Sequence, residues 1–170
     1  MYITNKTKAE KKYEEQQQSL KFDELKYNQL ISAIKENKAE EVENLIKELN
    51  SKTLSKIDNN GETALTWAAS KGLEKVCEML ISKMSDQAIN HVTKTYGETA
   101  LTLAAGYGLK KVCEMLIPIM TEQAINQVNS GGSTALTLAA FKGLEKVCEM
   151  LISKMSNEAI NHVTNYGIRL

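Results

Sequence analysis

Apolar and polar positions follow the same order along three stretches of the chain. In the first stretch the apolar residues are spaced three or four apart, as on one face of a helix; they are Leu73, Val76, Cys77, Leu80, Ile81 and Met84. The charged residues Glu74, Lys75 and Glu78 fall on the opposite face. The pattern predicts an amphipathic helix over 73–84, and its copies predict the same over 109–120 and 144–155.

A shorter helix is predicted just before each amphipathic one. The hydroxyl of Thr63 can accept the first free N–H groups of a helix, and the Ala-Leu-Thr-x-Ala-Ala that follows is rich in helix formers. Gly72 marks the end of this helix, because glycine readily takes the left-handed conformation. The equivalent residues in the copies are Thr99 with Gly108 and Thr134 with Gly143. Each stretch therefore predicts a helix-turn-helix unit.

The units form a repeat whose copies start at Gly61, Gly97 and Gly132, 36 and then 35 residues apart. Between 61–93 and 132–164, 28 of 33 positions are identical, so the copies can be compared as an alignment. A period of this length is typical of stacked units, and we predict an all-α solenoid. Positions held fixed among the copies should carry the fold, whereas positions that differ are free to carry specificity.

The repeated segment Gly-x-Thr-Ala-Leu-Thr-x-Ala-Ala-x-x-Gly-Leu-x-Lys-Val-Cys-Glu-Met-Leu-Ile resembles the ankyrin repeat over 61–81, 97–117 and 132–152. The resemblance implies an ankyrin-repeat solenoid with short finger loops that binds a partner protein and performs no catalysis. Alanine replaces the usual proline at the first helical position. Threonine replaces the usual histidine at Thr66, Thr102 and Thr137. We therefore expect the inter-repeat hydrogen bonds of that histidine to be weaker or to be made by the hydroxyl.

The end of each unit departs from the family. Ser85 can cap one extra helical turn, after which Ile89 and Val92 are expected to return to the core. The segments that follow differ in length and type among the copies, and the resemblance places them at the tips of fingers. These tips are residues 93–96, 129–131 and 164–166.

A divergent copy precedes the clear ones. A shift of 35 residues aligns Leu30 with Leu65 and Asn37 with Gly72, and asparagine is the best substitute for glycine at a left-handed position. We predict an N-terminal capping repeat over 26–60, full repeats over 61–96, 97–131 and 132–166, and an incomplete repeat over 167–170. Residues 1–25 are predicted to be a charged arm, either a frayed helix or disordered. Trp67 takes the place of Leu103 and is expected to fit between the cap and the first full repeat.

The last full repeat is predicted to have no polar cap, and three explanations remain open. The sequence is one piece of a longer protein, or a partner or second copy covers the open face, or the reading frame is truncated. If a second copy covers the open face, the chain self-associates through this end.

The composition narrows the range of partners. The chain has 21 basic and 21 acidic residues, a net charge of zero and a single arginine, Arg169, so we expect no binding to nucleic acid or to a membrane surface. No signal peptide or membrane span is recognisable, and we expect a location in the cytoplasm of the producing cell, or of a host cell if the protein is delivered there. Cys77, Cys113 and Cys148 are expected to pack in the core.

No site for chemistry is recognisable. His91 and His162 are expected to lie at the surface or to pack in loops, because neither has the further cysteine or histidine that would complete a zinc site. Glycine-rich phosphate loops, Ser-His-Asp sets and paired carboxylates are missing as well, so we expect no catalytic residue, no cofactor and no metal.

The positions that differ among the copies are the candidates for partner binding, and by resemblance they line a concave groove. Tyr107 and Phe141 are the expected anchors, because exposed aromatic residues dominate interface energies. Alternatively, these two side chains only lean on the next repeat. The predicted contact residues are Glu62, Ser70, Lys71, Lys94, Tyr96, Glu98, Tyr107, Ser133, Phe141 and Lys142.

Two other functions stay open. The chain can be a targeting or regulatory module of a larger enzyme. It can also be an effector of a host-associated bacterium, an alternative that rests on the lysine- and asparagine-rich composition and on the habits of the family.

Overall fold

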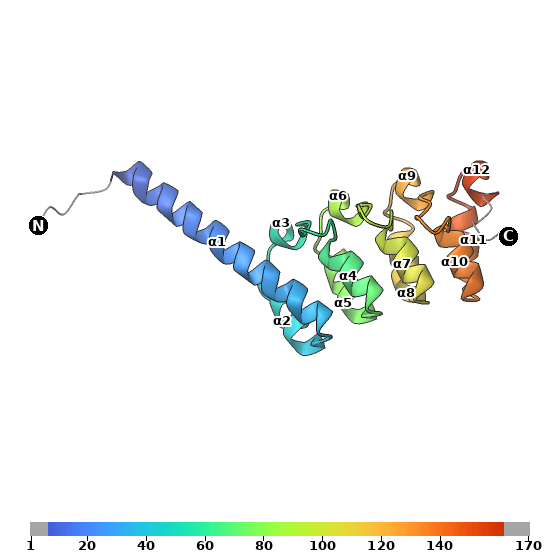
Figure 1. Cartoon of the computed structure of the whole chain (residues 1–170), viewed down its shortest axis with the longest axis horizontal. Helices are drawn as coiled ribbons and strands as arrows, with labels where there is room; N and C mark the ends of the chain where they lie inside the picture. The colour runs from blue at the N-terminus through green and yellow to red at the C-terminus, as the bar shows by residue number, and fades with distance from the viewer. Residues whose placement is uncertain (1–6, 162–170) are drawn as a thin grey trace, which may run out of the picture.

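The computed structural model describes residues 7–161, which form a row of stacked helices led by one long helix (Figure 1). Within this range there are no strands, and one isolated bridge joins Ile57 to Thr63. Each unit contains an inner helix, an outer helix and a single-turn helix. The helices are α1 (Lys8–Lys35), α2 (Ala39–Glu48), α3 (Ser51–Leu54), α4 (Ala64–Ser70), α5 (Glu74–Ile81), α6 (Asp86–Ile89), α7 (Ala100–Gly106), α8 (Lys110–Leu116), α9 (Glu122–Ile125), α10 (Ala135–Phe141), α11 (Glu145–Ile152) and α12 (Asn157–Ile160).

The predicted helix signals act as expected. The Thr63 hydroxyl accepts from the N–H of Thr66 at 3.1 Å and caps α4. Ser85 likewise caps the extra turn α6. Asn37 has a φ of 59°, so it takes the left-handed position that glycine holds in the later units. The outer helix α5 is shorter than predicted, because Leu73 is its N-cap and regular helix ends at Ile81.

The threonines at the histidine position do not make inter-repeat bonds. The Thr66 hydroxyl accepts from the Thr63 N–H at 2.9 Å and donates to the Thr63 carbonyl, also at 2.9 Å. Its hydrogen bonds are therefore made within its own unit, so of the two expected alternatives the hydroxyl does not take over the inter-repeat bonds.

Neighbouring units are instead joined through the single-turn helices. Residues at the end of one unit accept a hydrogen bond from the backbone N–H that opens the next single-turn helix. Asn90 Oδ1 accepts from the N–H of Thr121 at 2.7 Å, and Asn126 Oδ1 accepts from that of Ser156 at 3.1 Å. Each polar bond fixes the register of one unit on the next.

Most of the stripe predicted from the sequence forms a continuous core, but in the last unit Ile152 is 52% exposed. Cys77 and Cys113 are fully buried, and burial raises the pKa of both thiols to about 12, so they pack as neutral apolar groups. Cys148 is only partly buried, because within 7–161 no further unit packs on the last one. Val92 is exposed rather than in the core, because the next residue, Thr93, takes the buried position.

The first unit is built on the end of the long helix. Helix α1 runs without a break across the predicted boundary between arm and cap, and burial begins at Tyr27. The part before this point projects beyond the stack (Figure 1). Residues 1–6 and 162–170 lie outside the described residues, and with them lie the last predicted finger, His162 and the predicted incomplete repeat.

Candidate partner-binding surface

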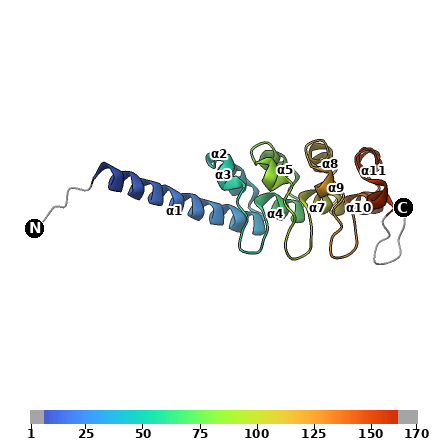
Figure 2. The same cartoon turned by 90° about the horizontal axis from the view of Figure 1, so that it is seen from above.

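The inner helices and the finger loops together make one side of the solenoid. In Figure 2, α1, α4, α7 and α10 form one layer and α2, α5, α8 and α11 form the other, and the loops extend from the inner layer. We call the side formed by the described fingers (58–61, 93–97 and 129–132) and the inner helices the inner surface.

Each finger is closed by the same polar turn, although its sequence differs. The first residue of the finger accepts a hydrogen bond from the N–H that follows the finger's closing glycine. Thr93 Oγ1 accepts from the Glu98 N–H at 2.9 Å, and Asn129 Oδ1 accepts from the Ser133 N–H at 2.8 Å. Asp58 Oδ1 does the same for Glu62 at 3.0 Å. These bonds fix the loops before any partner arrives, which lowers the entropic cost of binding.

Neighbouring fingers also hold one another. His91 Nε2 lies 2.8 Å from the Gly61 carbonyl oxygen, so the predicted loop-packing role of this histidine is confirmed. The Ser130 N–H donates to the Tyr96 carbonyl at 2.8 Å. The stem of Lys94 packs so closely on Gly61 that an added Cβ there would lie 2.9 Å from Lys94 Cγ.

The two predicted anchors are open to solvent. Tyr107 is 57% exposed and Phe141 is 81% exposed. Tyr96 at the second fingertip is 61% exposed. The other predicted contact residues divide into exposed lysines (Lys71, Lys94 and Lys142) and partly buried side chains (Glu62, Ser70, Glu98 and Ser133).

A half-buried apolar row lies along the inner helices, and the sequence reading missed it. Leu103 and Leu138 pack partly on the core and keep part of their surface open. Between them, Gly106 leaves a gap: an added Cβ would meet only the Leu138 methyl groups, both at 3.9 Å. Because these leucines are equivalent positions in two copies, their repetition looked like packing alone.

Trp67 heads this row and lies where the sequence predicted. Its Nε1–H donates to Asp58 Oδ2 at 2.9 Å, and the Lys35 ammonium is 4.2 Å from the centre of its ring. Lys35 belongs to α1, so the indole joins the first unit to the second.

The two predicted glutamates have different surroundings. Glu98 accepts hydrogen bonds from the Thr102 hydroxyl and, at 2.8 Å, from Asn129 Nδ2 of the next finger. At Glu62 the equivalent residue of the next finger is Thr93, whose hydroxyl bonds to the backbone instead. Burial is the main reason that the pKa of Glu62 lies above its usual range, and the nearby charge of Asp58 adds to it.

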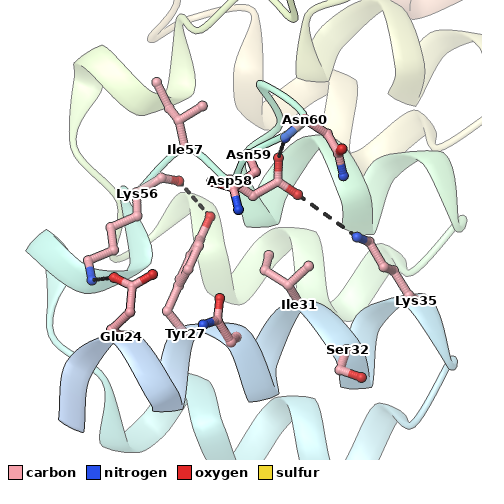
Figure 3. A pocket seen from close by; sticks show the side chains of 11 residues that line it. Glu24, Tyr27, Ile31, Ser32, Lys35, Lys56, Ile57, Asp58, Asn59 and Asn60 are labelled. Carbon is pink, nitrogen blue, oxygen red and sulfur yellow. Dashed lines mark hydrogen bonds and ion pairs between the residues drawn. The ribbon is translucent and has the colours of Figure 1, made fainter. Parts of the chain in front are cut away.

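A polar pocket of about 360 Å³ opens at the N-terminal end of the inner surface (Figure 3). The Tyr27 hydroxyl donates to the Lys56 carbonyl at 2.6 Å on one side, and Lys56 Nζ pairs with Glu24 at 2.7 Å. On the other side Lys35 lies 3.9 Å from Asp58. The sequence reading missed this pocket, because it forms only when the long helix α1 takes the place of an inner helix.

Asp58 is the charged centre of this region. Burial alone would raise its pKa, but hydrogen bonds from the Glu62 N–H, the Trp67 indole and the Asn60 N–H outweigh burial and hold the pKa of Asp58 below its usual range. The carboxylate is therefore ionised at neutral pH.

The described residues contain no group of three histidine, cysteine or acidic side chains placed to hold a metal ion. Within the same residues, none of the helices has the length and apolar character to cross a membrane.

The family model for ankyrin repeats in three copies matches residues 12–93 and 83–164. An ankyrin repeat protein of Rickettsia felis is 58% identical over 67 residues, which are 38% of this chain and 21% of that protein. A second ankyrin repeat protein, from Rickettsia bellii, is 53% identical over 61 residues, which are 36% of this chain and 11% of that protein. The matched segments thus span only a small part of these relatives.

Proposed function

The chain belongs to the ankyrin-repeat family, and on this premise we propose that it binds another protein through its inner surface, without catalysis. Ankyrin repeats are generally protein-interaction modules. The contact residues proposed are those whose identity differs among the copies, with Tyr107 and Phe141 as anchors.

The exposure of these two aromatic rings carries the proposal. In the first full unit the positions of Tyr107 and Phe141 are occupied by Lys71 and Ser70, so the fold does not need a ring at either place. Large exposed rings beside a half-buried leucine row give a partner much apolar area at a small entropic cost.

The test compares two pairs of aromatic residues. The chain carrying Tyr107→Ala and Phe141→Ala is used as bait in lysates of bacterial and animal cells, beside the native chain. The matched control carries Tyr13→Ala and Phe22→Ala, which remove rings that are 63% and 59% exposed on the projecting part of α1. We expect the first pair to lose the recovered protein and the control pair to keep it. Equal recovery by all three stable proteins would remove the inner surface from the proposal.

Self-association through the last unit is a second candidate. Ile152 is 52% exposed, whereas its equivalents Ile81 and Ile117 are 8% and 0% exposed. An exposed apolar face of this kind fits another copy of the chain. Analytical ultracentrifugation should then show a dimer that Ile152→Lys dissociates, and a native chain that sediments as a monomer at high concentration contradicts it.

We also propose that the chain is a module of a larger protein in the cytoplasm. The relatives are much longer than their matched segments, which supports a module within a larger protein. The three free cysteines fit a reducing compartment such as the cytoplasm.

A further inference from the structure

We infer that the polar pocket between α1 and the first finger (58–61) binds the main chain of a short segment of the partner protein. The inference deepens the proposed function and rests on it, because the pocket opens at one end of the inner surface. It names the chemistry that this end recognises, which is the N–H and C=O groups of a peptide rather than a particular side chain.

The first observation is that two positions of the later fingers are used for contact with the finger before them. One position lies two residues before the finger, and His91 Nε2 there is 2.8 Å from the Gly61 carbonyl oxygen. The other position is the second residue of the finger. The stem of Lys94 packs there on Gly61, and in the next finger the Ser130 N–H donates to the Tyr96 carbonyl at 2.8 Å.

In the first finger the same two positions are Lys56 and Asn59, and both line the pocket. A shift of 35 residues back from 58–61 leads to 23–26, but these residues belong to helix α1. The pocket of about 360 Å³ therefore lies where a neighbouring finger is packed at the later junctions. Because α1 continues past this place beyond the stack (Figure 2), a short peptide segment fits there better than a whole further unit.

The second observation is that the charged groups around the pocket are paired with one another. Figure 3 shows Lys56 Nζ beside Glu24 on one side, at 2.7 Å, and Lys35 beside Asp58 on the other, at 3.9 Å. Two ammonium groups thus balance two carboxylates, and the pocket offers no excess charge to an ion such as phosphate. This balance favours an uncharged polar ligand.

The third observation is a set of three asparagine side chains around the same pocket. Asn28 comes from α1, and Asn59 and Asn60 come from the finger. Among the residues that the structure describes, none of the three carboxamide groups makes a hydrogen bond, since the bond of Asn60 comes from its backbone N–H. A carboxamide both donates and accepts, so it can pair with the C=O and the N–H of a peptide main chain.

The test uses the side-chain amides of these asparagines as reporters. The full chain, isotope-labelled, is titrated with acetyl-tetra-alanine amide, and NMR follows the amide signals of Asn28, Asn59 and Asn60. The matched probe is the same peptide with every backbone nitrogen methylated, which keeps the carbonyl groups and loses the N–H donors. We expect saturable shifts with the first peptide and about tenfold weaker binding of the methylated one.

A pocket variant and a control variant complete the test. Asn28→Ala with Asn59→Ala should lower the affinity for the first peptide about tenfold, followed through the remaining Asn60 signal. The control is Asn44→Ala with Asn157→Ala, which removes two exposed asparagines that do not line the pocket. Its affinity should stay within about twofold of the native one. Because all four substituted side chains are exposed, both variants should keep the fold.

Three results would overturn the inference: no saturable shift, equal binding of the two peptides, or an unchanged affinity in the pocket variant. If partner recovery still depends on Tyr107 and Phe141 in that case, the proposed function stands and only the peptide pocket falls.

Discussion

The faces with which units pack on one another and the inner surface come from the same repeat. Their residues, however, differ among the copies to different degrees. Leu65, Leu101 and Leu136 occupy one equivalent position and are all at most 2% exposed. Ser70, Gly106 and Phe141 occupy another equivalent position on the inner surface and share no chemistry. Full burial therefore goes with a residue that cannot change, and position 70 with its equivalents is a place where packing imposes no one side chain.

The two regions should differ most in how much stability is lost when a side chain is truncated. Leu101 is fully buried, so Leu101→Ala should lower the free energy of unfolding by about 2 to 5 kcal/mol, as cavities in cores do. Leu103→Ala, two residues along on the inner surface, should cost clearly less because that side chain is partly open. Urea unfolding measures both. Equal losses would mean that the leucine row belongs to the core.

Two cysteines at equivalent repeat positions allow the same comparison between a buried and a partly open side chain. Cys113→Ser should lower the unfolding free energy by about 1 to 3 kcal/mol, because the new hydroxyl is buried without an assured partner. Cys148→Ser should cost less, since that thiol is only partly buried. Thermal melts of the two variants give the answer, and an unchanged Tm for Cys113→Ser contradicts the burial on which this comparison depends.

Replacing each of two nearby glycines by alanine should change the stability in opposite directions. Gly108 has a φ of +74°, so Gly108→Ala should destabilise the fold by about 1 kcal/mol through backbone strain alone. Gly106 lies in helix α7 with only Leu138 nearby, so Gly106→Ala should stabilise by about 0.5 kcal/mol. The same alanine fills the gap in the leucine row and should weaken partner binding. Parallel urea unfolding and partner recovery separate the two effects.

The smallest expected effect is at Glu62, one of the proposed contact residues. Because the pKa of Glu62 is raised in the folded state, its ionisation disfavours folding above that pKa, and the penalty disappears as the pH falls through it. Glu62→Gln should therefore raise the Tm slightly at pH 7, with little gain at a pH low enough to protonate the native side chain. Melts across this pH range check the prediction, and a Tm that falls at pH 7 is the opposite result.

Much of the fold could be predicted because its signals are local. The cap at Thr63, the turn at Asn37 and the extra helix after Ser85 each depend on a few neighbouring residues, and all three are as expected. Whether Thr66 would bridge units could not be decided from the sequence; it does not, because a hydroxyl so close to the helix start finds partners in its own backbone.

The candidate site was harder to predict because it depends on distant contacts. The pocket beside Asp58 needs Lys35 from another unit, and the difference between the two glutamates depends on one residue of the following finger. The exposure of Cys148 likewise depends on what lies beyond its own unit. Comparing the copies identified positions that vary, but not which of them already have partners.

The most direct test of the account measures stability and partner recovery on one variant, Tyr107→Ala with Phe141→Ala. Because both rings are exposed, we predict an unfolding free energy within about 0.5 kcal/mol of the native chain. In the same preparation, recovery of the partner should be lost, while the Tyr13→Ala and Phe22→Ala control retains it. A double variant that is equally stable and recovers the partner as well as the native chain would contradict the claim that the diverged positions of the inner surface carry binding.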